Sequence, residues 1–114
     1  MPPTRNQEAE DELCRLQAEF CKGMAHPKRI LILNILEDGE KSVNELAELT
    51  GIPQANLSQH LSKLRQLGLL QTRRDGPNVR YRISDMRIME ACDLVKKTIG
   101  DRLRKTHMVV QVTR

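Results

Sequence analysis

Aromatic side chains are scarce in this chain of 114 residues, which has one Phe, one Tyr and no Trp. Protein-binding surfaces are enriched in aromatic residues, so this scarcity argues against a module built to bind another protein. A Gly-rich phosphate loop is absent, and the three histidines are scattered, without a Ser-His-Asp or Cys-His arrangement. An enzyme is therefore not expected, and no catalytic residue is predicted.

Long apolar runs are absent as well. No segment stays apolar over the roughly 20 residues that a membrane-spanning helix needs, and the N-terminus lacks the basic start and apolar core of a signal peptide. A cytoplasmic protein without a membrane partner is therefore expected. Three cysteines, an odd number in a chain without an export signal, argue against a structural disulfide framework.

The size and the charge distribution indicate a small DNA-binding domain. A chain of 114 residues has limited apolar surface to bury by itself, which favours pairing with a second copy. We expect residues 1–6 to be disordered, residues 7–106 to form one domain and residues 107–114 to form a tail. The net charge is only +4, but residues 54–82 hold six basic residues against the single acid Asp75. A basic segment of this kind is typical of a phosphate-binding surface.

The segment 52–70 predicts a helix with two different sides. Leu57, Leu61 and Leu64 follow the i, i+4, i+7 spacing of one buried helix face. The outer side carries amides, hydroxyls and one ammonium group, and no carboxylate that would repel phosphate. Such groups can read base edges in the major groove of DNA, although an ordinary solvated helix face is the alternative. The predicted DNA-binding residues here are Gln54, Asn56, Ser58, Gln59, Ser62 and Lys63.

The flanking segments indicate a winged helix-turn-helix. Ser42 and Glu45 have the spacing of a capping box, which begins a short helix that ends at Thr50-Gly51. Two short helices joined by a Gly-containing turn are typical of a helix-turn-helix. After the second helix, strand-like runs at 69–74 and 79–83 flank the turn-rich residues 75–78, which predicts a hairpin, the wing. The predicted fold class is therefore mainly α with a small β-hairpin.

The hairpin carries four arginines that we expect to contact phosphates. Val79, Tyr81 and Ile83 alternate with basic residues, the period-two pattern of a half-buried strand. One face should pack on the helices while Arg80 and Arg82 face outward. Guanidinium groups match phosphate geometry, although a merely solubilising role is the alternative. The phosphate-binding residues predicted in the hairpin are Arg73, Arg74, Arg80 and Arg82.

The first and last helices are predicted to form a dimer interface. The first runs from about residue 8 to 23, and the last from about residue 86 to 105 after Ser84-Asp85. Each carries an apolar stripe that its own subunit does not fully cover, so pairing across a two-fold axis would bury both. The stripes are Leu13, Leu16, Phe20 and Met24 in the first helix, and Ile88, Cys92, Val95, Ile99 and Leu103 in the last.

The helix between them begins at His26-Pro27 and ends at residues 37–39. Its apolar density is typical of a central core helix, with Ile30, Leu31 and Leu33 among its members. His26 precedes a proline at a helix start, where a capping or packing role is favoured over metal binding. His60 lies beside the leucine face of the helix 52–70 and is expected to be a packed, hydrogen-bonded histidine rather than a base reader.

Four motifs occur in a fixed order along the chain. They are Ser42-Val-Asn-Glu-Leu-Ala, Asn56-Leu-Ser-Gln-His-Leu-Ser-Lys-Leu-Arg, Leu67-Gly-Leu-Leu, and Arg73-Arg-Asp-Gly followed by Tyr81. Together they resemble the ArsR-SmtB family of bacterial winged-helix repressors over roughly residues 15 to 105. The resemblance implies a homodimer on double-stranded operator DNA, released when a metal ion or, in some members, a thiol-reactive species acts on it. Pro53 and Pro77 depart from the family, which often has a Ser cap and a basic wing-tip residue there.

The metal sites that the resemblance implies are not matched. One requires cysteines in the helix before the recognition helix, where this chain has Glu45-Leu-Ala-Glu-Leu. The other requires histidines on the last helix, where the chain offers Asp93 and Asp101 but no histidine before His107. A four-ligand zinc site of that type is therefore not expected. Sulfur-responsive relatives place a reactive pair in the second and last helices, and the second-helix position here is Asn34.

The cysteines Cys14, Cys21 and Cys92 are the remaining effector residues to consider. The first two are about 10 Å apart along a helix axis, which is too far for a disulfide. Across a dimer, however, either could approach Cys92, where thiolates could hold arsenite or another thiophilic ion, or be oxidised. The alternative is that all three are small packing residues.

The predicted function is therefore a sequence-specific DNA-binding transcriptional regulator. We expect a repressor that is released from its operator by an inducer acting on cysteine thiols. The metal, if there is one, is unknown, and no other cofactor is predicted. The alternatives are a winged-helix protein-interaction module and a constitutive DNA-binding regulator without a small-molecule effector.

Overall fold

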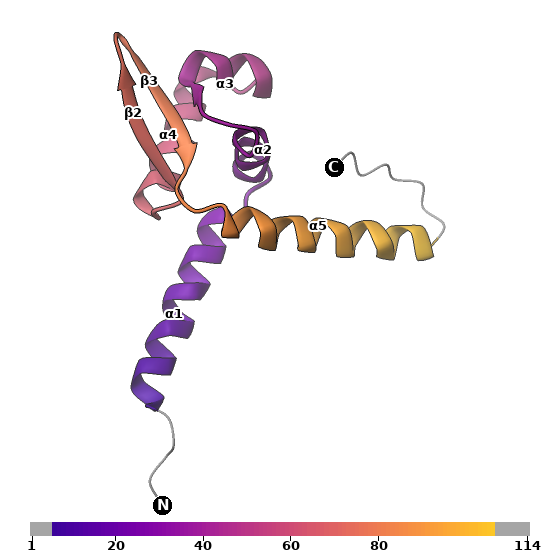
Figure 1. Cartoon of the computed structure of the whole chain (residues 1–114). Coiled ribbons are helices and arrows are strands. Elements are labelled where there is room, and N and C mark those ends of the chain that lie inside the picture. Colours follow the sequence, from indigo (N-terminus) through magenta and orange to yellow (C-terminus); the bar gives the residue numbers. More distant parts are fainter. Residues whose placement is uncertain (1–5, 107–114) are drawn as a thin grey trace, which may run out of the picture. The chain divides into compact units, whose positions relative to one another are not determined.

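The computed structural model describes residues 6–106, which form five helices and three strands. The chain divides into two units after Ser84 (Figure 1). The first unit contains seven elements in chain order, and the second contains a single helix. The first unit holds α1 Gln7–Met24, α2 Pro27–Leu36, β1 Lys41–Ser42, α3 Val43–Thr50, α4 Gln54–Gln66, β2 Leu70–Asp75 and β3 Asn78–Ile83, and the second holds α5 Arg87–Lys105.

The core of the first unit lies among α2, α3 and α4. Leu57, Leu61 and Leu64 of α4 are each 0% exposed, which confirms the predicted leucine face. They share the core with residues of α2 and α3 and with the first residue of β2 and the last residue of β3. Each buried leucine contributes about 1.5–3 kcal/mol relative to exposure, so this face fixes how α4 sits in the unit. The other buried apolar residues of this unit are Ile32, Leu33, Leu36, Leu46, Ile52, Leu69, Leu70 and Ile83.

The helix-turn-helix forms as its sequence predicts. The Ser42 side chain accepts a hydrogen bond from the Glu45 N–H at 3.2 Å, and the Glu45 carboxylate accepts one from the Ser42 N–H at 3.0 Å. This reciprocal capping box begins α3. Gly51 ends the helix with a φ of 70°, a left-handed conformation that glycine adopts without strain. Both predicted ends of this helix are therefore confirmed.

Helix α4 is shorter than the predicted segment 52–70. Pro53 is the N-cap residue and provides no side-chain hydrogen bond, so the helix begins at Gln54. At the other end Gly68 has a φ of 79°, which turns the chain out of the helix. Leu70 then pairs with Ile83 as the first residue of β2. We placed Leu69 and Leu70 both in the helical segment and in the strand-like run 69–74, and the structure puts them at the transition from α4 to β2.

The three strands form an antiparallel sheet in the order β1-β3-β2. The predicted hairpin is confirmed, and Asp75 pairs with Asn78 across a two-residue turn. Gly76 opens this turn with a φ of 61°, the positive value that tight hairpin turns require. Strand β1 was not predicted, because two residues are too short for a periodic pattern. It pairs with β3 through Lys41↔Tyr81 and Ser42↔Arg80.

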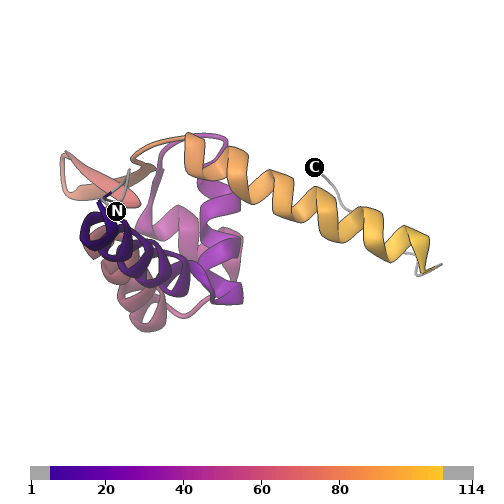
Figure 2. The ribbon, with the colours of Figure 1, turned by 90° about the horizontal axis from the view of Figure 1, so that it is seen from below.

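Helix α1 extends away from the core of the first unit in Figure 1 and points toward the viewer in Figure 2, which is seen from below. Asn6 caps it by accepting a hydrogen bond from the Ala9 N–H at 3.1 Å, so this residue is ordered, contrary to our expectation of disorder over 1–6. The rest of that expectation, and the tail 107–114, lie outside the described residues. On this helix Leu13 is 64% and Leu16 48% exposed.

Helix α2 confirms one expectation and corrects another. The His26 ring Nδ1 accepts a hydrogen bond from the Lys28 N–H at 3.1 Å, so His26 caps the helix as predicted. Ile30 and Leu31, however, are 43% and 40% exposed, so the helix is buried along one side only. The core side carries Ile32, Leu33 and Leu36 instead.

A polar cluster joins α2 to the middle of α4. The Arg29 Nε–H donates to the His60 Nδ1 at 3.1 Å, and its Nη1 donates to the Gly23 carbonyl at 2.8 Å. The His26 and His60 rings meet edge-on with centroids 4.6 Å apart. Burial, followed by electrostatic interactions with His26, Arg29 and Lys28, lowers the pKa of His60. His60 is therefore the packed, hydrogen-bonded histidine that we predicted.

The second unit consists of α5 and the residues that start it. Met86 is the N-cap residue, and the Asp85 carboxylate accepts from the Arg87 N–H at 3.0 Å. The hydrogen bonds from Arg87 lower the pKa of Asp85 to about 2. On the helix, Leu94, Val95 and Ile99 are more than half exposed, at 67%, 60% and 52%. Among residues 6–106, no helix is long and apolar enough to span a membrane.

Replacing Ser42 with alanine should destabilise the first unit by about 0.5–2 kcal/mol, because the cap of α3 is lost. Equilibrium unfolding in urea measures this difference. Ser58→Ala is the matched control, because Ser58 is exposed inside a helix. An equal loss in the two variants would contradict the importance of the capping box.

Stability should fall as the pH is lowered below 6.5, the ordinary pKa of His60. The His60 Nδ1 accepts a hydrogen bond only in the neutral ring, so the folded state disfavours protonation. The contribution is fully present above pH 6.5 and is lost as the pH falls through the lower folded-state pKa. Urea unfolding midpoints at about pH 7.5 and about pH 5.5 test this. His60→Gln should remove part of the difference, and an undiminished difference in that variant would contradict the assignment.

Candidate nucleic-acid interface

The outer face of α4 is exposed along its whole length. Every side chain that we assigned to DNA reading on this helix is exposed to solvent: Gln54, Asn56, Ser58, Gln59, Ser62 and Lys63. The helix contains no carboxylate, and its last turn carries Lys63 and Arg65. The side chains therefore present hydrogen-bond donors and acceptors without a negative charge that would repel DNA.

Gln54 is held in place by Asn44, a neighbour that was not predicted. The Gln54 Nε2 donates to the Asn44 Oδ1 at 2.8 Å, which joins the start of α4 to the first turn of α3. Both side chains are exposed, so the Gln54 Oε1 and the Asn44 amino group stay available for an outside partner. Asn44 lies two residues after the cap Ser42, and this position next to the helix-turn-helix was the signal that could have identified it.

Lys63 marks the edge of the face that lies toward α1. It follows Gln59 by one helical turn and borders a hollow of about 490 Å³. Three of the lining side chains are cationic and one is acidic, so the hollow carries a positive balance. Its lining residues are Glu19, Lys22, Gly23, Arg29, Lys63 and Leu67.

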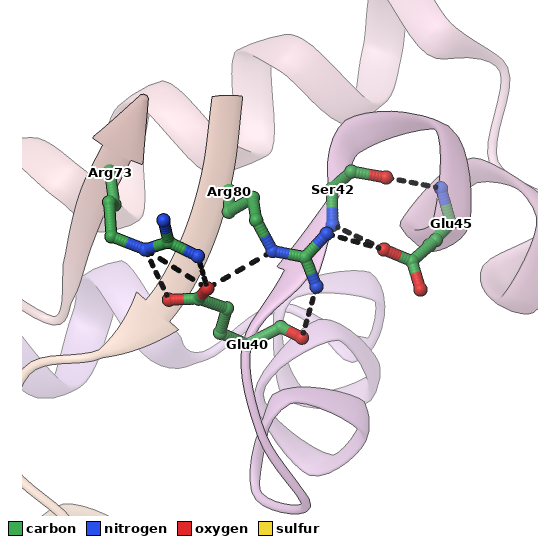
Figure 3. Close-up of polar contacts among 5 residues, drawn as sticks. All are labelled: Glu40, Ser42, Glu45, Arg73 and Arg80. Carbon is green, nitrogen blue, oxygen red and sulfur yellow. Dashed lines mark hydrogen bonds and ion pairs between the residues drawn. The ribbon is translucent and has the colours of Figure 1, made fainter. Parts of the chain in front are cut away.

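The four arginines of the wing fall into two pairs. Arg74 and Arg82 are exposed, and the Arg82 Nη2 donates to the Gln71 Oε1 at 2.8 Å. Arg73 and Arg80 both bind the carboxylate of Glu40, which precedes β1 (Figure 3). The prediction that Arg80 faces freely outward is therefore wrong, because its side chain is only 24% exposed and is ion-paired. Glu40 was not among the predicted residues, since no local pattern links it to residues that lie 33 and 40 positions away.

These ion pairs set the charge state of the acids beside the wing. The hydrogen bonds from Arg73 are the main cause that lowers the pKa of Glu40. Desolvation raises this pKa, but the hydrogen bond from Arg80 and the charges of both arginines lower it further, so it lies below its usual value. The same contact raises the pKa of Arg73. The backbone N–H of Ser42 is the main cause that lowers the pKa of Glu45. Both carboxylates are therefore charged at neutral pH.

The cysteines lie outside this surface. Cys14 and Cys21 are exposed on α1, and Cys92 is half-buried on α5 in the second unit. Asn34 is half-buried on α2. In the part of the chain that the structure describes, no three His, Cys, Asp or Glu side chains are grouped as a metal site.

Comparisons with known proteins agree with this architecture. Residues 26–72 match the family model described as bacterial regulatory protein, arsR family. The nodulation protein NolR of Rhizobium meliloti is 39% identical over 101 residues, which cover 89% of this chain and 79% of NolR. The crystal structure of Rv0081 from M. tuberculosis superposes with a TM-score of 0.76 at 39% identity, over 82% of this chain and 95% of that one.

A third similar protein is the homodimeric winged helix-turn-helix DNA-binding domain of Mb0332 from Mycobacterium bovis. It has a TM-score of 0.76 and 29% identity, over 90% of this chain and 94% of that one. The matched region of the family model runs from the cap of α2 through α3 and α4 into β2, which is the part that presents the exposed face. This chain therefore belongs to the ArsR family of bacterial regulatory proteins, a family of winged helix-turn-helix transcriptional regulators.

Proposed function

We propose that the protein is a sequence-specific transcriptional repressor that binds operator DNA as a homodimer. The observation that carries this proposal is the exposed face of α4, which has amides and hydroxyls and no carboxylate. Gln54, Ser58, Gln59 and Ser62 would read base edges in the major groove, with Asn56 and Lys63 at the borders of the contact. Exposed arginines of the wing would contact the phosphates, which position the protein without reading sequence.

A dimer through α1 and α5 is supported by the apolar surface that each helix exposes. Leu13 and Leu16 on α1 are about half to two-thirds exposed, at 64% and 48%. On α5, Val95 and Ile99 are also exposed, at 60% and 52%. Apolar side chains gathered along one helix are stabilised when a partner covers them. Two copies would read an imperfect palindrome with half-sites about one helical turn, or a multiple of it, apart.

Release from DNA is proposed to act through the cysteine thiols. Cys14 and Cys21 are exposed in their own subunit, so their thiols are open to contact with a reagent or with a partner subunit. A thiophilic ion or an oxidant that joins them to Cys92 of the partner helix in the dimer would change how α1 and α5 pack. Because the recognition helices are carried by that interface, such a change would alter their separation and weaken binding to both half-sites.

Gln59→Ala should weaken binding to the operator by about 1–3 kcal/mol, because a bidentate contact to one base is lost. Binding to random duplex should change little, because phosphate contacts remain. Electrophoretic mobility shifts with the promoter region of the protein's own operon measure both affinities. Gln17→Ala, which removes an exposed amide from α1, is the control. Equal losses on operator and random DNA would contradict base reading by Gln59, and no DNA binding by the unmodified protein would favour a protein-interaction module.

Cys92→Ser should fold, dimerise and bind the operator, but it should no longer be released by a thiophilic inducer. Titration of the reduced protein-DNA complex with arsenite, persulfide, peroxide and zinc identifies which inducer acts on the unmodified protein. Cys14→Ser and Cys21→Ser should each reduce the response if three thiolates bind an ion, and only one of them should matter if a disulfide forms. Release of the triple serine variant by the same inducer would show that the effector acts elsewhere.

A further inference from the structure

We propose that Glu40 is a positioning residue that holds Arg73 and Arg80 in internal ion pairs, so that Arg74 and Arg82 are the wing cations that contact DNA phosphates. The inference rests on the DNA binding proposed above and deepens it. It assigns different roles to four arginines that the sequence alone does not distinguish. Figure 3 shows the contacts of Glu40 with Arg73 and Arg80.

The strand register creates a need for a carboxylate at this place. Arg73 of β2 lies directly opposite Arg80 of β3. Like charges directly opposite each other destabilise an antiparallel pair. The Glu40 Oε1 accepts from the Arg80 Nε at 3.0 Å and from the Arg73 Nε at 3.1 Å, so one carboxylate lies between both cations and reduces their mutual repulsion.

Each of the three guanidinium nitrogens of Arg80 already contacts an acceptor within the protein. Its Nε binds the Glu40 carboxylate, its Nη2 donates to the Glu40 carbonyl at 3.2 Å, and its Nη1 lies 3.3 Å from the Glu45 carboxylate. Glu45 is itself a member of the α3 capping box. Arg80 therefore ties the wing strand to the segment before β1 and to the first turn of α3, and its role is structural.

Arg73 is more exposed but is also engaged. Its Nε and Nη2 both donate to the Glu40 carboxylate, while its side chain is 54% exposed. This bidentate pair occupies the Nε–Nη2 edge of the guanidinium, one of the edges through which Arg73 could bind a phosphate, and places a negative charge beside it. Glu40 is 24% exposed and bound by a second arginine, so its carboxylate is held in place. Arg73 is therefore held by Glu40, and its charge is offset by that carboxylate.

Arg74 and Arg82 differ from this pair. Within residues 6–106, neither of them forms an ion pair with a carboxylate, and both side chains are exposed. The hydrogen bond from Arg82 goes to the neutral amide of Gln71 and leaves its positive charge uncompensated. These two guanidinium groups are the wing cations that can replace counterions on DNA.

The salt dependence of DNA affinity tests the assignment, because each phosphate contact contributes about 0.9 to the slope of log K against log salt concentration. Arg74→Ala and Arg82→Ala should each flatten the slope by about 0.9. Arg73→Ala should leave it unchanged, since this arginine makes no phosphate contact. Random duplex is the probe, so that base reading does not contribute.

Removing the carboxylate should release Arg73. Glu40→Gln should steepen the slope by about 0.9. The double variant Glu40→Gln with Arg73→Ala should return to the slope of the unmodified protein. Glu48→Gln is the matched control, because it removes the same charge from an exposed position on α3. Circular dichroism and urea unfolding of each variant establish that the wing and α3 are folded.

Two results would overturn the inference. One is that Arg73→Ala, in which Glu40 is intact, flattens the slope as much as Arg74→Ala does. The other is that Glu40→Gln changes the slope no more than Glu48→Gln. Failure of the proposed function is distinct from both, since the unmodified protein would then bind no DNA and would give no slope to compare.

Discussion

The burial of Leu57, Leu61 and Leu64 is the constraint on which the rest of the structure depends. All three are 0% exposed, so α4 cannot rotate about its axis without exposing leucine to water. The orientation of the outer face is therefore fixed by the core and not by the residues that the face carries. Residues at positions 59 and 62 can be substituted without changing the direction in which the side chains at these positions point. The stability of the helix is therefore separate from the DNA sequence that it would recognise.

The sequence predicts those parts of the fold that local chemistry decides. The capping box of Ser42 and Glu45, the left-handed Gly51 and the hairpin turn at Gly76 each depend on neighbours within a few residues. The end of α4 was predicted too late, because Leu69 and Leu70 continue an apolar pattern that fits a helix as well as a strand. Gly68 decides between them through its backbone conformation.

The candidate site was predicted where it lies on one helix and missed where distant segments meet. The outer face of α4 follows from helical periodicity alone. The separation of the wing arginines into two pairs depends on Glu40, which reaches them only after β1 has joined β3. Strand β1 is two residues long and has no signal of its own, so the contact could not be anticipated. In the same way, Ile30 and Leu31 are exposed although their sequence is as apolar as that of the core.

The double role of Glu45 restricts how this protein can change over evolution. A capping box accepts glutamine as readily as glutamate at this position. Here the same carboxylate oxygen that accepts from the Ser42 N–H also lies 3.3 Å from the Arg80 Nη1. Glutamine would preserve the cap but would remove the negative charge beside Arg80. The substitution would therefore leave the stability of α3 unchanged and weaken the contact between α3 and the wing. Substitutions in the first turn of α3 and in the wing are therefore coupled. Changes at positions 40, 45 and 80 should be tolerated in combination more readily than one at a time.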